Sequence, residues 1–182
     1  MINTKADADG AMRNTLSNYV LGLVFITHCD DLNWATIGKT TLIAMSPSLK
    51  TECSLAPLLS GISSLKNERP IAVREFQGML RRAAVGESHE LLVAYCESTN
   101  QFTKYRSVPW FQFARIARNT VSHKQGGIVC WPDDLRKAGL KEVFWRHRVI
   151  RESDHGNEFQ ITDAEILQLF GDMLGFLERE LT

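Results

Sequence analysis

Apolar residues recur every three or four positions over several long stretches of the chain, which is the spacing of an amphipathic helix. The first such stretch runs from Ala11 to about Cys29 and predicts a long, well-buried helix. Its apolar positions include Leu16, Tyr19, Val20, Leu23, Phe25 and Ile26. Residues 1–10 are polar, and we expect them to be frayed.

The next region, 30–67, is less regular and contains Pro47, Pro57 and Gly61. It predicts two short helices at 34–45 and 55–65, because a proline is tolerated in the first turn of a helix.

Three later helices are predicted from their ends as well as from their spacing. The stretch 70–85 opens on a proline and stops before Gly86, and 88–99 begins at Ser88, whose side chain can cap a helix. The third runs from Ser107 or Val108 to about Lys124, where two glycines end it.

The final fifth of the chain changes in pattern. The segments "EVFWRHRVI" (142–150) and "EFQIT" (158–162) flank the turn-rich "RESDHGN" and predict a small β-hairpin over 142–162. The last segment begins with Thr162 and Glu165, which form a capping box, and carries apolar residues on one face. The fold class is therefore all-α, a single domain over 1–182 built as a helical bundle with a small β-hairpin before the C-terminal helix.

Composition narrows the choice of function. The 182 residues carry a formal net charge of zero, so no global field attracts a polyanion and any such ligand needs a local patch. The four cysteines lie far apart without a secretory signal, which is typical of free thiols in a reducing cytoplasm. The longest apolar run, "YVLGLVFI", is too short to span a bilayer. We expect a cytoplasmic protein without a membrane partner.

Three further features of the sequence resemble phosphate-binding, metal-binding or acid–base sites, but none of them meets the requirements of such a site. "NWATIGKTT" ends like a phosphate-binding loop, but Asn33 occupies the position of the required first glycine. In "HCDD" (28–31), adjacent side chains point to different sides of a helix, so we interpret it as the end of the first helix rather than a metal site. The acidic residues after Gly127 show no spacing that pairs two carboxylates. No cofactor and no metal are expected.

The stretch "ARIARNTVSHKQGG" (114–127) gives an otherwise apolar helix a polar end. Arg118, Asn119 and His123 fall largely outside the apolar stripe, and Asn119 and His123 stack four residues apart. Arg118 and His123 are five residues apart, roughly 140° around an ideal helix. One interpretation is a solvated helix end, where cations favour the carbonyl end of the dipole.

The other interpretation is RNA cleavage without metal, in which the 2′-hydroxyl attacks the adjacent phosphate. A histidine with a pKa near ~6.5 can move the proton, and an arginine can stabilise the phosphate as its charge grows. An amide such as Asn119 can orient either group.

With these residues, the chain resembles the HEPN superfamily of compact helical domains. The family signature is an arginine, a polar residue that is often asparagine, and a histidine spaced R-x(4–6)-H near the end of a late helix; "RNTVSH" matches it through Arg118, Asn119 and His123. The order of helices, hairpin and final helix is also similar.

The resemblance implies a metal-independent endoribonuclease, often the toxic or defensive arm of a bacterial conflict system, with a cognate antitoxin protein as one expected partner. It also implies a homodimer in which both protomers bring Arg118 and His123 into one shared cleft. Two copies of Arg118, Lys124 and Arg115 would concentrate positive charge in that RNA-binding groove. Two alternatives stay open: a non-catalytic nucleotide-, RNA- or partner-binding module of the same fold, and a helical interaction protein without a polyanion site.

Overall fold

The computed structural model describes residues 4–37, 39, 41–46, 49–54, 56, 68–122 and 127–182. The chain divides into two compact units: unit 1 is Met1–Val20 with Met79–Thr182, and unit 2 is Leu21–Gly78. The boundary falls within helix α1 (Lys5–Thr27) and within helix α4 (Glu68–Ser98). Compactness alone does not make a segment an independent domain, so the single domain over 1–182 stays a prediction.

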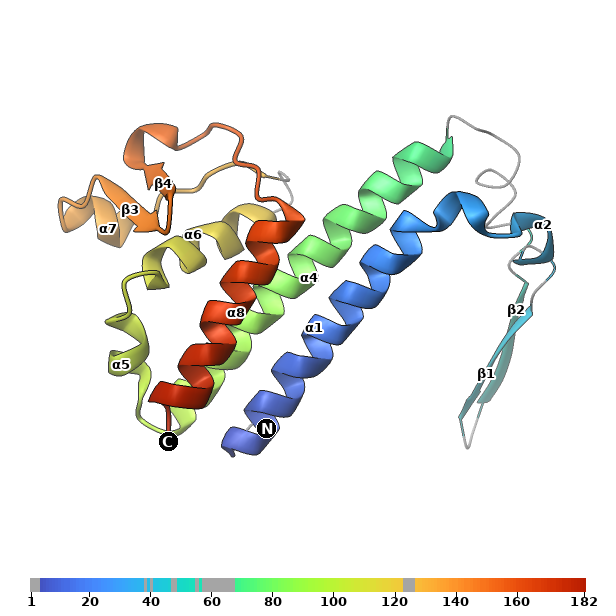
Figure 1. The fold of residues 1–182 in the computed structure, drawn as a ribbon, viewed down its shortest axis with the longest axis horizontal. Coiled ribbons are helices and arrows are strands. Elements are labelled where there is room, and N and C mark those ends of the chain that lie inside the picture. The colour runs from blue at the N-terminus through green and yellow to red at the C-terminus, as the bar shows by residue number, and fades with distance from the viewer. Residues whose placement is uncertain are drawn as a thin grey trace. The chain divides into compact units, whose positions relative to one another are not determined.

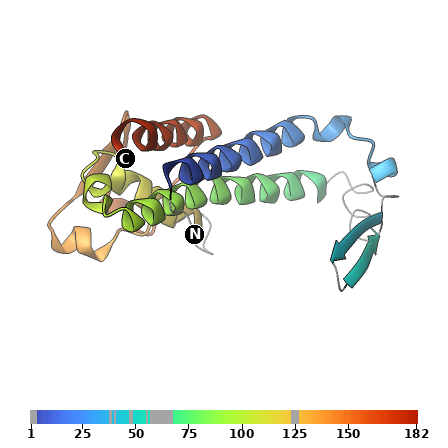
Figure 2. The ribbon, with the colours of Figure 1, turned by 90° about the horizontal axis from the view of Figure 1, so that it is seen from below.

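Unit 1 is a helical bundle in which the start of α1, the end of α4 and the final helix α8 (Asp163–Glu180) lie side by side (Figures 1 and 2). The remaining elements gather on the side of α4 and α8 that faces away from α1 (Figure 1). They are α5 (Phe102–Arg106), α6 (Phe111–Ser122), α7 (Asp133–Lys137), β3 (Glu142–Trp145), β4 (Arg148–Arg151) and the short η2 (Glu152–Asp154). The predicted helical bundle with a small hairpin before the last helix is confirmed.

The core of unit 1 is apolar and rich in aromatic side chains. Its most deeply buried residues come from six different elements and the loops between them; they include Met12, Leu92, Tyr95, Tyr105, Phe113, Ile116, Trp131, Ile150, Ile166 and Leu177. Burial of this much apolar surface is the main force that holds the bundle together.

The expectation of a frayed N-terminus is wrong from Lys5 onward. Thr4 and Asp7 cap the helix reciprocally, since the Thr4 hydroxyl donates to the Asp7 carboxylate and accepts from the Asp7 amide. Lys5 donates to the backbone carbonyls of Glu178 and Leu181, and Ala8 is buried. The polar residues therefore anchor this end of α1 to the end of α8.

The two helices predicted at 70–85 and 88–99 form one continuous helix, α4, so no helix ends at Gly86. Ser88 does not cap a helix; its hydroxyl donates to the carbonyl of Ala84 within α4. A glycine costs about 1 kcal/mol relative to alanine inside a helix, which the burial of its neighbours outweighs. The buried stripe of Val85, His89 and Leu92 runs across Gly86 without a break.

The predicted start of the next helix at Ser107 or Val108 is also wrong. Ser107 closes α5 instead, because its hydroxyl donates to the carbonyl of Lys104, and α6 begins at Phe111. The predicted end at Lys124 lies outside the described residues. Gly127 takes a φ of +90°, a conformation that glycine adopts without strain.

The hairpin is tighter than predicted. β3 pairs with β4 antiparallel, with Glu142 opposite Arg151 and Trp145 opposite Arg148, so Arg146 and His147 form the turn. The segment 158–162, expected as the second strand, contributes only an isolated bridge between Glu158 and Ile128. Val143, Trp145 and Ile150 bury one face of the hairpin.

Ion pairs fasten this hairpin to α8. Arg146 binds Asp172, and Arg148 lies 2.6 Å from Glu165 while its guanidinium stacks over Phe159. The arginines of "WRHRVIR" therefore bind carboxylates of the same chain.

The capping box of α8 is confirmed. The Thr162 hydroxyl accepts from the Glu165 amide, and the Glu165 carboxylate accepts from the Thr162 amide. Burial opposes ionisation of Glu165, but the hydrogen bonds from Thr162 and the charge of Arg148 lower its pKa.

Replacing Thr162 by alanine is expected to lower the free energy of unfolding by about 1 kcal/mol, because the first turn of α8 loses a capping acceptor. Urea unfolding followed by circular dichroism measures the change. Thr103→Ala, an exposed position within α5, is the control and should leave stability unchanged. Equal stability of Thr162→Ala and the unmodified protein would contradict the capping role.

Unit 2 holds the end of α1, the short helices η1 (Cys29–Asp31) and α2 (Trp34–Ile37), the strands β1 (Thr41–Ser46) and β2 (Leu49–Ser54), and the start of α4. "HCDD" follows the end of α1, as predicted. The helix expected at 34–45 is confirmed over Trp34–Ile37 and wrong over 41–45, because 41–46 pairs with 49–54 as an antiparallel hairpin. Apart from Ala56, the helix expected at 55–65 lies outside the described residues.

Candidate functional site

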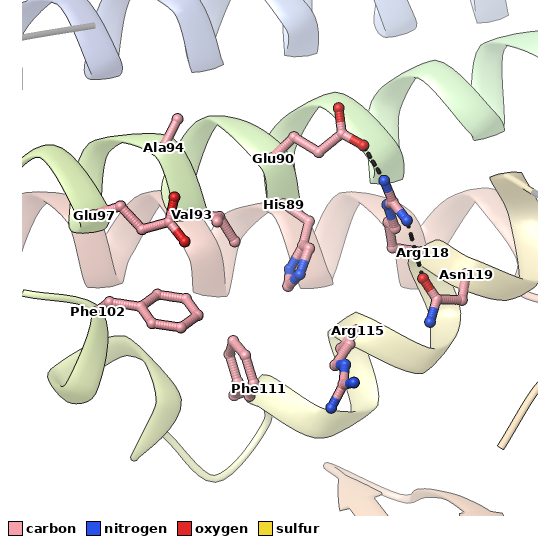
Figure 3. Close-up of a pocket in the computed structure, with 10 residues that line it drawn as sticks. All are labelled: His89, Glu90, Val93, Ala94, Glu97, Phe102, Phe111, Arg115, Arg118 and Asn119. Atoms are coloured by element: carbon pink, nitrogen blue, oxygen red, sulfur yellow. Dashed lines mark hydrogen bonds and ion pairs between the residues drawn. The ribbon is translucent and has the colours of Figure 1, made fainter. Parts of the chain in front are cut away.

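A pocket of about 320 Å³ opens in unit 1 between α4 and α6 (Figure 3). From α4 it receives His89, Glu90 and Glu97. From α6 it receives Arg115, Arg118 and Asn119, and the rings of Phe102 and Phe111 close one end (Figure 3). The pocket thus combines aromatic walls with charged and amide groups, a lining typical of sites that bind small polar molecules.

The pattern of apolar residues along α6 explains why its polar side chains line the pocket. Phe113, Ala114, Ile116 and Ala117 are fully buried, so they fix which side of α6 packs on the core. Arg115, Arg118 and Asn119 flank that stripe and remain partly exposed, as the sequence predicts.

Arg118 and Asn119 contact each other directly. The Nη1 atom of Arg118 donates to Oδ1 of Asn119 over 3.0 Å, and its Nη2 atom donates to the carboxylate of Glu90 (Figure 3). Because the amide oxygen faces the guanidinium, the NH2 group of Asn119 is left as a donor without a partner among the described residues. The structure therefore brings together two of the three predicted catalytic residues.

The hydrogen bonding of Arg118 is incomplete. Its Nε atom is buried and has no hydrogen-bond partner within the described part of the chain. The side chain of Glu90 is 59% exposed, and ion pairs of this exposure contribute little to stability. An anion that replaced Glu90 would therefore displace a weakly held partner.

Arg115 lines the same pocket but is already paired. Its two terminal nitrogens bind the carboxylate of Asp134 at 2.8 and 2.9 Å, a bidentate contact that joins α6 to α7. The hydrogen bonds from Arg115 lower the pKa of Asp134. The arginine predicted to bind substrate thus also holds α7 against α6.

The other predicted site residues, His123 and Lys124, lie outside the described residues. α6 ends at Ser122, the residue just before His123. In sequence, His123 therefore follows directly on the helix that carries Arg118 and Asn119.

His89 also lines the pocket, although no predicted motif includes it. It is 6% exposed, and its Nδ1 atom lies 2.9 Å from the hydroxyl of Tyr105. Burial, and next the positive charge of Arg118, lower the pKa of His89 to about 4. His89 is therefore neutral at physiological pH.

A signal for His89 exists in the sequence. It lies four residues after Val85 and three before Leu92, so a stripe continued across Gly86 places a histidine on a buried face. Ending a helix at Gly86 hides this pattern, because His89 then falls in the first turn of a new helix.

Within the described ranges, no three His, Cys, Asp or Glu side chains are grouped as metal ligands. In the same residues, no helix combines the length and apolar character needed to cross a membrane. In comparisons with known proteins, the chain matches no family model, no curated protein and no solved structure.

Proposed function

We propose that this protein is a metal-independent endoribonuclease that cleaves RNA through Arg118, Asn119 and His123. The observation that carries the proposal is the contact between Arg118 and Asn119 at the open pocket, with His123 next in sequence after Ser122, the last described residue of their helix. A guanidinium with a weakly held carboxylate partner and an amide whose NH2 group has no partner among the described residues together suit a phosphate oxygen.

In the proposed reaction, the RNA supplies its own nucleophile. His123 takes the proton of a 2′-hydroxyl, a bond forms from that oxygen to the adjacent phosphorus, and the bond to the 5′-oxygen breaks. A second histidine returns a proton to the leaving 5′-oxygen, which leaves 2′,3′-cyclic phosphate and 5′-hydroxyl ends. Arg118 stabilises the charge that grows on the phosphate, and Asn119 orients it.

The proposal includes a homodimer, because the reaction needs one proton acceptor and one proton donor. His123 of the partner subunit would supply the second, and two copies of Lys124 would concentrate positive charge in one groove of a protein whose net charge is zero. The HEPN resemblance supports a cytoplasmic toxin or antiphage-defence effector as the biological role, with a cognate antitoxin as inhibitor.

Arg118→Gln is expected to lower the rate of RNA cleavage by about 100-fold or more, because the transition state loses a charged donor. The measurement is digestion of mixed cellular RNA in EDTA, with gel analysis of fragments and detection of cyclic phosphate ends. Arg82→Gln changes an exposed arginine of α4 that does not line the pocket, and it should cleave at the normal rate.

Cleavage at the normal rate by Arg118→Gln would overturn the proposal. RNA binding by the unmodified dimer without any cleavage would favour the non-catalytic binding module. An absence of both binding and cleavage would favour a helical interaction protein.

A further inference from the structure

The buried pair of His89 and Tyr105 determines which nitrogen of His89 carries the proton. Tyr105 is fully buried, and the hydroxyl has a single hydrogen-bond partner in the described residues, the Nδ1 atom of His89. A buried hydroxyl proton without an acceptor is costly, so the hydroxyl donates and Nδ1 accepts. The proton of the neutral ring then belongs on Nε2.

The ring of His89 points from α4 into the pocket, toward α6 (Figure 3). No hydrogen bond from Nε2 to any described residue exists. A buried histidine thus offers one neutral N–H donor to the pocket. This donor is fixed in direction, because Tyr105 holds the opposite nitrogen.

The walls beside this donor are aromatic and apolar. Phe102 and Phe111 meet edge to face with their ring centroids 6.2 Å apart, and the centroid of Phe111 is 5.8 Å from that of His89. Phe102 is partly exposed and can accept a flat ring, whereas Phe111 is buried and supports it from behind. A bare phosphate would make no use of such walls.

The positive charge of the pocket lies at its other end, whereas the carboxylate of Glu97 lies beside Phe102 at the aromatic end (Figure 3). Arg118 and Asn119 lie on the last turns of α6, past Arg115 as seen from Phe111 (Figure 3). The pocket therefore has an aromatic end with a neutral donor and a cationic end with an amide. Its volume of about 320 Å³ is at the lower end of the roughly 300–1,000 Å³ range of small-molecule sites.

We propose that the pocket is a base-binding subsite, in which one unstacked RNA base lies against Phe102 and accepts a hydrogen bond from Nε2 of His89. The phosphate next to that base lies on Arg118. Sequence-dependent RNA recognition commonly works this way, with splayed bases stacked on aromatic rings and hydrogen-bonded along their edges. The identity of the ligand as RNA rests on the proposed function.

His89 is on this view a specificity-determining residue and not the proton-transfer group. A histidine whose pKa lies well below neutrality is a poor proton acceptor at pH 7, whereas its N–H remains a good hydrogen-bond donor. The two roles are thus divided between His123, for proton transfer, and His89, for base selection.

The test compares ligands with and without a base. Calorimetry measures binding of the four ribonucleoside monophosphates, as 3′- and 5′-phosphates, and of ribose 5-phosphate. We expect at least one nucleotide to bind tenfold or more tightly than ribose 5-phosphate, since base stacking on an aromatic ring supplies a gain of that order. Equal affinity for nucleotides and ribose 5-phosphate would overturn the proposal.

Variants of His89 then test the donor. His89→Phe keeps an aromatic ring but lacks the N–H. It should lower the affinity for the preferred nucleotide about tenfold and leave the affinity for ribose 5-phosphate unchanged. His89→Gln offers an N–H near the same position and should restore part of the affinity. His147→Phe, in the exposed hairpin turn, is the matched control. Unchanged nucleotide preference in a folded His89→Phe protein would overturn the proposal.

Nitrogen-15 NMR of the imidazole rings gives a readout independent of folding defects. We expect His89 to carry its proton on Nε2 at neutral pH, and that signal to shift when the preferred nucleotide binds. A proton on Nδ1 would overturn the assignment.

Failure of the subsite and failure of the proposed function are separable. RNA cleavage with no effect of His89 on base preference would remove the subsite and leave the ribonuclease intact. Base-dependent nucleotide binding by a protein that never cleaves RNA would retain the subsite and remove the catalytic proposal.

Discussion

Replacing His123 by alanine is expected to lower the rate of RNA cleavage by a factor of about 100 to 10,000, because general acid–base catalysis contributes that much. In the proposed dimer, one substitution removes both the proton acceptor and the proton donor. Any toxicity on expression should disappear with it. The measurement is the initial rate of RNA cleavage in EDTA, with and without the substitution.

Two controls make this result interpretable. Circular dichroism and sedimentation should show an unchanged fold and dimer, since His123 is assigned to chemistry and not to the core. His147→Ala removes an exposed histidine of the hairpin and should cleave RNA at the normal rate. Cleavage at the normal rate by His123→Ala would refute the role of His123 and with it the proposed mechanism.

The second large effect concerns stability as the pH falls. His89 has a pKa of about 4 in the folded protein, against an ordinary value of 6.5. Between these values the unfolded chain binds a proton that the folded protein does not, so stability falls as the pH is lowered from about 6.5 to about 4. The shift corresponds to a loss of about 3 kcal/mol across that window, with no further loss from this group below it.

Urea unfolding at pH 7.5, 6, 5 and 4 measures the slope. In His89→Phe, which has no group to titrate at this position, the loss between pH 6.5 and 4.5 should be absent. The lowered carboxylate pKa values of Asp134 and Glu165 act mainly below this window, because their unfolded values are near 4. A parallel pH dependence in the unmodified and His89→Phe proteins would contradict the assignment.

The sequence predicts an element well where the signal for that element is local. The capping box of Thr162 and Glu165 and the apolar face of α8 lie within a few turns of one helix, so spacing alone reveals them. The split of α4 at Gly86 and the extension of the helix at 34–37 as far as residue 45 came from weak local signals. Burial across elements overrides the glycine, and pairing with 49–54 determines the strand 41–46.

The same distinction between local signals and contacts across elements applies to the candidate site. The sequence by itself determined the order and spacing of Arg118, Asn119 and His123, which need no partner element, and the clustering of all three stays a prediction because His123 lies outside the described residues. Only the tertiary structure decided that Arg118 meets Glu90, that Arg115 holds Asp134, and that His89 and Phe102 line the same pocket. The two ion pairs join residues that are 28 and 19 positions apart in the sequence, and the pocket joins residues from three different helices. The spacing of side chains within one helix does not show which neighbouring element packs against that helix.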